Sequence, residues 1–134
     1  MCWYTPERLT SLQGFKKLQD LDLSNNQISG CLEPLQFCTG LESLDVSHNQ
    51  LSGGLESLQG CTALRQLHLS HNQLRGGLEP LQGCTALQAL DLCANHLTGG
   101  IAKTLMSCTA LWELDLSRNL LTDGCPDGGM IIRC

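Results

Sequence analysis

Two short segments carry a serine directly before a histidine: Ser47-His48 and Ser70-His71. A serine beside a histidine suits nucleophilic catalysis, but that chemistry also needs a residue that orients the histidine and a loop that binds an oxyanion, and the sequence indicates neither. Two histidines near a carboxylate such as Asp45 suit a divalent metal ion. Because both segments have the sequence Ser-His-Asn-Gln, duplication of a repeat is sufficient to explain why the two histidines occupy equivalent positions. We therefore predict that the protein is not an enzyme and has no cofactor or dedicated metal site, with metal binding at the two histidines as the alternative.

Nine of the 134 residues are cysteine, and four of them recur at a nearly constant spacing. Near the N-terminus the same position is Phe15, which indicates a buried apolar environment where free cysteine packs as a small hydrophobe. We predict a ladder of reduced core thiols, with a disulfide or a metal site as alternatives, although no CxxC pair of the kind that binds zinc occurs. Of the remaining cysteines, Cys31, Cys93 and three near the ends, we expect some to be exposed and oxidisable. The four recurring residues, to which we assign a structural role, are Cys38, Cys61, Cys84 and Cys108.

The elements that position these residues follow from a repeat. The chain repeats itself every 23 residues over 18–40, 41–63, 64–86 and 87–110, the last copy with one extra residue. Residues 111–121 begin a fifth copy, and residues 9–17 match the second half of a copy. We interpret residues 1–134 as a single domain, with 1–17 and 111–134 as half repeats or caps. One copy cannot bury its own leucines, so the copies are expected to stack.

Each copy spells LxxLxLSxNxLxGxLxxLxxCTx, and its two halves have different periods. Apolar and polar residues alternate over residues 43–46, which predicts a strand with one buried and one wet face. Over residues 54–61 the apolar residues are three apart, which predicts one or two turns of helix or 3₁₀ helix. Glycine pairs such as Gly53-Gly54 lie between the halves and permit unusual φ angles.

This spelling resembles the leucine-rich repeat family along nearly the whole chain. The resemblance implies an α/β solenoid: an arc with a parallel β-sheet on its concave face and short helical or 3₁₀ turns on its convex face. Shorter matches are similar to three subgroups. Residues 52–56 (SGGLE) resemble the acidic leucine-rich nuclear phosphoprotein family, the GCTAL segments resemble cysteine-bearing repeats of bacterial and protist proteins, and LSxNxLxG is similar to plant-type repeats.

One asparagine recurs in each copy, and an asparagine amide can bond backbone groups at the turn after a strand. We predict a buried structural ladder, as the family resemblance also implies, with an exposed row that contacts a partner as the alternative. Its members are Asn26, Asn49, Asn72, Asn95 and Asn119.

The remaining strand positions are expected to line the concave face, where a central column is acidic in four of five copies. Like charges on adjacent strands repel, so either this column serves a basic partner or it only keeps the face soluble. Trp112 interrupts a polar column and is expected either to anchor an interface or to cover the C-terminal end. The predicted binding residues are Asp20, Asp22, Asn25, Ser43, Asp45, His48, Gln66, His68, His71, Asp91, Trp112, Glu113, Asp115 and Arg118.

We predict an interaction module whose rigid scaffold binds a protein or peptide of basic character. The alternatives are a regulatory subunit or adaptor of a phosphatase or ubiquitin ligase, and a thiol- or metal-responsive structural protein. The net charge is −5 and the eight Lys and Arg residues are scattered, which argues against nucleic acid and membrane surfaces as partners. The first residues lack a basic region followed by an apolar run, and with reduced thiols this predicts an intracellular, cytoplasmic protein. The incomplete end repeats suggest self-association through exposed edges.

Overall fold

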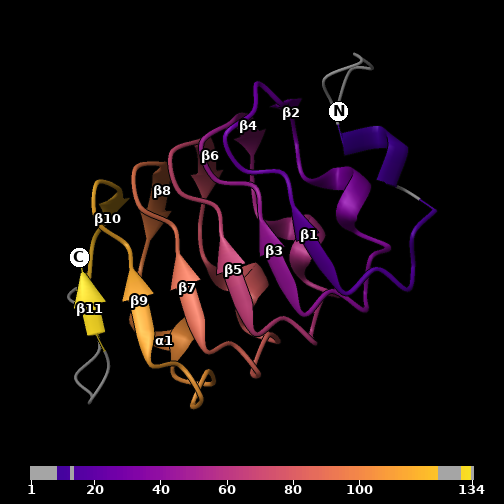
Figure 1. The fold of residues 1–134 in the computed structure, drawn as a ribbon. Coiled ribbons are helices and arrows are strands. Elements are labelled where there is room, and N and C mark those ends of the chain that lie inside the picture. The colour runs from indigo at the N-terminus through magenta and orange to yellow at the C-terminus, as the bar shows by residue number, and fades with distance from the viewer. Residues whose placement is uncertain (1–8, 13, 124–130, 134) are drawn as a thin grey trace.

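The computed structural model describes residues 9–12, 14–123 and 131–133 (Figure 1). The strands form two parallel sheets, one in the order β1-β3-β5-β7-β9-β11 and the other in the order β10-β8-β6-β4-β2. The strands of the first sheet are β1 (Asp20–Asp22), β3 (Ser43–Asp45), β5 (Gln66–His68), β7 (Ala89–Asp91), β9 (Glu113–Asp115) and β11 (Ile131–Arg133). The strands of the second sheet are β2 (Ser29–Gly30), β4 (Gln50–Gly53), β6 (Gln73–Gly76), β8 (His96–Gly99) and β10 (Leu120–Leu121).

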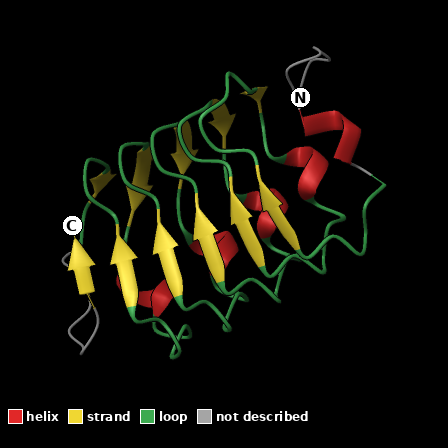
Figure 2. Ribbon diagram, in the orientation of Figure 1, coloured by secondary structure: helices red, strands yellow, loops and turns green. Residues whose placement is uncertain are grey.

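Short helices lie behind the first sheet (Figure 2). In the described part of the chain, four are 3₁₀ helices, and the fifth is the single-turn α-helix α1 (Ala102–Leu105). In two of the 3₁₀ helices a proline occupies an early position, where its missing N–H breaks no helical hydrogen bond. The 3₁₀ helices span Leu9–Leu12, Glu33–Leu35, Glu56–Leu58 and Glu79–Leu81.

Successive copies stack in register in the first sheet. Leu21 pairs with Leu44, and Leu44 with Leu67, so each strand lies beside the same strand of the next copy. The predicted α/β solenoid is therefore confirmed, with the six-stranded sheet on the concave face and the short helices on the convex face. Equivalent side chains of all copies consequently form straight columns across the sheet.

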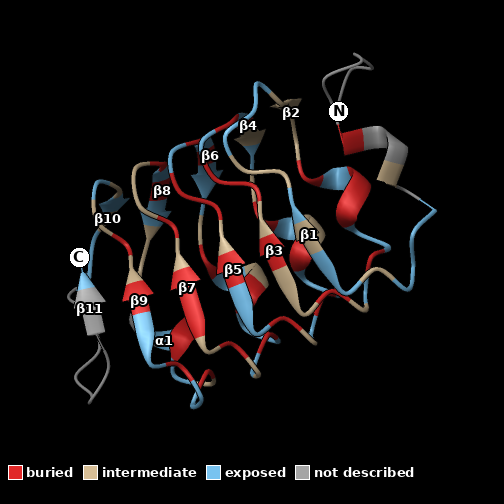
Figure 3. Cartoon of the chain, in the orientation of Figure 1, coloured by how far each residue is buried: buried red, intermediate tan, exposed pale blue. Residues whose placement is uncertain are grey.

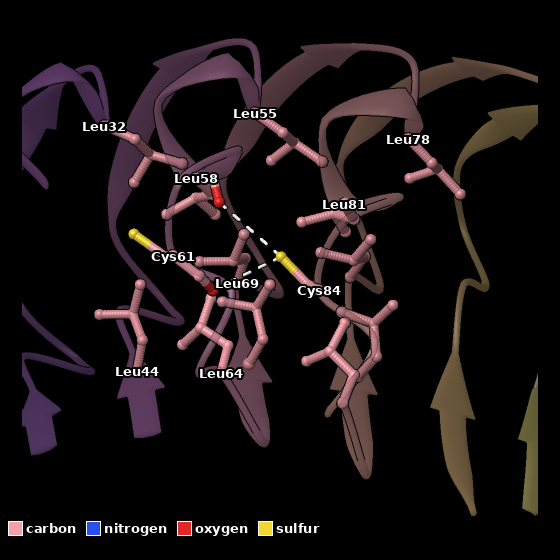
Figure 4. Packing of buried hydrophobic residues seen from close by; sticks show 14 of the residues in the cluster. Leu32, Leu44, Leu55, Leu58, Cys61, Leu64, Leu69, Leu78, Leu81 and Cys84 are labelled. Carbon is pink, nitrogen blue, oxygen red and sulfur yellow. Dashed lines mark hydrogen bonds between the residues drawn. The ribbon is translucent and has the colours of Figure 1, made fainter. Parts of the chain in front are cut away.

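The core is a continuous aliphatic cluster between the sheets and the helices (Figures 3 and 4). In β3, β5, β7 and β9 the middle residue is a buried leucine, and Leu44 and Leu67 have no exposed surface. A fully buried leucine contributes about 1.5–3 kcal/mol relative to an exposed one. The recurring cysteines lie in the same cluster, between the leucines of their own copy and those of the copy before.

The second sheet is not indicated by the sequence. Its longest strands, such as Gln50–Gly53, contain one leucine each, and a single apolar residue between polar ones sets no period. Four of these strands end at a glycine with positive φ, so the left-handed turn that glycine adopts readily directs the chain toward the helical segment. These glycines are Gly30, Gly53, Gly76 and Gly99, with φ of 93°, 79°, 86° and 86°.

The N-terminal end of the solenoid differs from expectation at two positions. Phe15 is 55% exposed rather than buried, although it occupies the place of the recurring cysteine. Asn26 is exposed as well. Phe15 belongs to the half copy 9–17 and Asn26 to the first full copy, and the half of a preceding copy against which each would pack does not lie within the described ranges. No helix in the described part of the chain is long and apolar enough to cross a membrane.

Candidate binding face

The central column of the concave face contains Asp22, Asp45, His68, Asp91 and Asp115, in register on neighbouring strands. Strand β11 extends this column, because Arg133 pairs with Asp115. Arg133 is not predicted from the sequence, since residues 131–133 do not match the repeat. The spelling Ile-Ile-Arg, with an apolar residue at the strand's centre, is the one signal that could have indicated it.

Most of the aspartates bond to the serine two residues later in the chain. Oδ1 of Asp45 accepts the N–H of Ser47 at 2.9 Å and its hydroxyl at 2.6 Å. Asp115 accepts the same two donors from Ser117 at 3.0 and 2.6 Å. The hydrogen bonds of these turns stabilise the carboxylates and so offset part of the charge repulsion between neighbouring aspartates. The recurring motif Asp-x-Ser could have predicted these turns.

The same turn occurs at the N-terminal end of the column. Ser24 donates its N–H and hydroxyl to Oδ1 of Asp22 at 2.9 and 2.7 Å. The hydrogen bond from the Ser24 hydroxyl holds the pKa of Asp22 below its usual value, and the Ser24 N–H contributes to a smaller extent. Both donors favour the ionised carboxylate. In these turns Oδ2 has no hydrogen-bond partner among the residues that the structure describes, so each carboxylate keeps an oxygen for a partner molecule.

The next column follows the strand ends and has a left-handed backbone. Every residue in it has φ between 54° and 57°, a conformation that asparagine and histidine adopt more readily than most residues. The rings of His48 and His71 stack, with centroids 4.2 Å apart and planes 12° apart. Within the described ranges, no group of three or more histidine, cysteine, aspartate or glutamate side chains is placed to hold a metal ion. The column contains Asn25, His48, His71, Ala94 and Arg118.

The other side of the central column is more varied. Asp20, Gln66 and Glu113 are exposed, and Ser43 is half-buried. Trp112 is 52% exposed just before β9. In the same outer column Arg65 Nε lies 3.8 Å from Glu42 Oε2, and both side chains are exposed enough for this ion pair to be weak.

The concave face is hollowed toward its C-terminal end. A hollow of about 200 Å³ is lined by residues of β5, β7, β9 and β11, including His68, Asp91 and Arg133. A second, wider hollow shares Asp91, Asp115 and Arg133 and extends to the two stacked histidines. The two hollows therefore form one depression across β5, β7, β9 and β11. Figure 1 shows these four strands side by side.

The recurring asparagines lie beneath the edge of this face and join neighbouring copies. Asn49, Asn72 and Asn95 are buried, whereas Asn119, near the C-terminal end, is half-buried. In each of the four, Nδ2 donates to backbone carbonyls of its own and the preceding copy, and Oδ1 accepts an N–H of the preceding copy. They satisfy backbone groups that would otherwise be buried without partners.

The recurring cysteines form a second ladder in the core. Cys84 Sγ lies 3.5 Å from the carbonyl oxygen of Cys61 and 3.8 Å from that of Leu58 (Figure 4). Burial raises the pKa of Cys61 and of Cys84 to about 11, because the apolar core disfavours the thiolate. Outside the ladder Cys93 is free and half-buried, whereas Cys31 is disulfide-bonded. The reduced state of the ladder thus does not extend to every cysteine.

The repeated sequence motif and the stacked strands agree with the protein family that matches this chain. The family described as Leucine Rich repeats (2 copies) matches residues 16–60 and 39–83, which together cover just over half of the chain. The chain belongs to the leucine-rich repeat family. No curated protein matches it in the sequence comparison.

Solved leucine-rich repeat structures are similar to this chain in fold. The BIR3–SERK2 complex from Arabidopsis thaliana contains a chain with 30% identity and a TM-score of 0.75, over 98% of this chain and 71% of that one. The ectodomain of the plant receptor kinase GASSHO1/SCHENGEN3 from Arabidopsis thaliana, solved with CASPARIAN STRIP INTEGRITY FACTOR 2, has 31% identity and a TM-score of 0.76, over 87% of this chain. Internalin C2 from Listeria monocytogenes has 27% identity and a TM-score of 0.77, over 88% of this chain.

Two of these proteins are much longer than this chain, which spans 14% of the GASSHO1/SCHENGEN3 chain and 50% of the internalin C2 chain. The similarity therefore concerns the repeat architecture.

Proposed function

We propose that this chain binds a protein or peptide of basic character on its concave face. The observation that carries the proposal is the in-register column with Asp22, Asp45, Asp91 and Asp115, in which each carboxylate keeps an oxygen without a hydrogen-bond partner among the described residues. Adjacent strands lie about 4.8 Å apart, so these four carboxylates make the column negative on both sides of His68. Similar solved repeats support the class of partner, since one is in complex with CASPARIAN STRIP INTEGRITY FACTOR 2 and another belongs to the BIR3–SERK2 complex.

A selection from a random peptide library displayed on phage tests this proposal. We expect the wild-type chain to enrich peptides rich in Lys and Arg, because opposite charges favour their binding. The double variant Asp45→Lys with Asp91→Lys changes the charge of the column by four, and it should not bind the selected peptides.

A matched control changes the same charge on the opposite side of the molecule. Glu56→Lys with Glu79→Lys alters two exposed residues of the 3₁₀ helices, so binding should persist. Circular dichroism and urea midpoints establish that both double variants are folded. Selected peptides that bind the Asp45→Lys, Asp91→Lys variant as tightly as wild type would contradict the proposal.

A further inference from the structure

The aspartate–serine turn is interrupted in two neighbouring copies of the concave face. In β5 the aspartate is replaced by His68, so Ser70 has no carboxylate two residues before it. Ser70 is only 4% exposed, and its hydroxyl has no hydrogen-bond partner among the described residues. The equivalent Ser47 does have a partner, since its hydroxyl donates to Asp45 at 2.6 Å.

The second interruption lies on the adjacent strand. Asp91 is followed by Cys93, which donates its N–H to Asp91 Oδ1 at 3.0 Å but has no hydroxyl to donate. Asp91 therefore accepts one hydrogen bond from the described residues, whereas Asp115 accepts two. The Ser70 hydroxyl and the Asp91 carboxylate thus line the same hollow, and no hydrogen bond joins them.

The surroundings of these two groups indicate the chemistry of a ligand. Asp91 and Asp115 are in register on β7 and β9, so their Cα atoms are about 4.8 Å apart. Each has Oδ2 available as an acceptor, and Ser70 Oγ provides further acceptor lone pairs. A ligand that complements this set must be a cation with several N–H donors.

We propose that the hollow binds the guanidinium group of an arginine side chain on a peptide or protein partner, through Asp91, Asp115 and Ser70. This inference rests on the proposed function and specifies the partner residue. The planar guanidinium carries five donors and can bridge two carboxylates, whereas a lysine ammonium is a compact point charge. A metal ion fits less well, because the described residues hold no cluster of three ligating side chains.

Arg133 occupies the far end of the same hollow and opposes a second cation. It is in register with Asp115, yet no ion pair joins the two side chains within the described ranges. Its charge lowers the affinity of the hollow for an incoming arginine. Removing this charge should therefore strengthen binding, which a purely structural role of the aspartates would not predict.

The test uses the probe peptide acetyl-Gly-Arg-Gly-amide, followed by amide chemical shifts of the full chain in NMR. We expect saturable shifts around β5, β7 and β9, and none with the neutral citrulline peptide. Asp91→Asn should weaken binding about tenfold, because it keeps the oxygen that accepts the Cys93 N–H but removes the charge. Arg133→Gln should tighten binding, and a lysine peptide should bind more weakly than the arginine peptide.

Glu56→Gln is the matched control, since it removes an exposed carboxylate on the opposite side of the molecule and should leave the dissociation constant unchanged. Ser70→Ala should weaken binding without lowering the urea midpoint, whereas Ser47→Ala should lower the midpoint. Equal binding of the arginine and citrulline peptides, or equal effects of Asp91→Asn and Glu56→Gln, would overturn the inference. If the selected library peptides bind only when the acidic column is intact but contain no arginine, only this inference is refuted. If the chain binds the arginine probe but enriches no library peptide, only the proposed function is refuted.

Discussion

Asn72 joins two consecutive copies, and replacing it tests whether the asparagine ladder supports their stacking. Its Nδ2 donates to the carbonyls of Val46, Leu69 and Ser70 at 3.0, 3.1 and 3.3 Å. Its Oδ1 accepts the N–H of Leu51 at 2.9 Å. The substitution Asn72→Ala removes all four bonds, but their loss does not have equal consequences.

Each of the three carbonyls keeps another donor after the substitution. In the same order, these donors are Asn49 Nδ2, Asn95 Nδ2 and the backbone N–H of His48. The N–H of Leu51 has no second acceptor among the described residues, and Leu51 has no exposed surface. A buried donor left without a partner costs about 1–3 kcal/mol, so we expect the free energy of unfolding to fall by that amount.

Urea denaturation measures this loss, and hydrogen exchange at the amide of Leu51 locates it. Asn26→Ala provides the matched control, because Asn26 is exposed and its Nδ2 donates only to Leu23 and Ser24 carbonyls. Its unfolding free energy should change by less than about 0.5 kcal/mol. If the two alanine variants lost equal stability, or if exchange at Leu51 stayed unchanged in Asn72→Ala, the reasoning about the ladder would be refuted.

Two further predictions concern titration. Because burial raises the pKa of Cys61 and Cys84 from 9.0 to about 11, the unfolded chain releases these protons first. The free energy of unfolding should therefore fall as pH rises from about 9 to about 11, and urea titrations at stepped pH should show a smaller fall in Cys84→Ala. Ser24→Ala should raise the pKa of Asp22 in an NMR titration, because the hydroxyl is lost, without restoring 3.8, because the N–H of residue 24 still donates. A pH-independent stability or an unchanged Asp22 titration would contradict the respective prediction.

The repeat and its architecture could be predicted from the residues because they are encoded locally. The period, the alternation in each strand segment and the three-residue spacing of the helical segment all lie within one copy. Leucines that one copy cannot bury require stacking, and stacking in register follows from near-identical copies. The residues that recur, the asparagines and cysteines, could thus be separated from the variable residues of the concave face.

The second sheet escaped prediction because its longest strands, such as Gln50–Gly53, contain one leucine each, whereas the strand segments of the first sheet have apolar residues at alternate positions, such as Leu44 and Val46. The exposure of Phe15 and Asn26 was also not predictable from their repeat positions, since burial there depends on a neighbouring copy rather than on residue type.

The repeat unit and its variable face could be predicted from the residues alone, because hydrophobic periodicity acts between residues close in the chain. Which side chains meet across copies depends on the folded arrangement. In the fold, Arg133 lies beside Asp115, His48 stacks on His71, and the Ser70 hydroxyl lines the same hollow as Asp91 with no hydrogen-bond partner among the described residues. These contacts join residues that are 18 or more positions apart, so they depend on strand register and on how the chain returns to the sheet, and no local pattern specifies either.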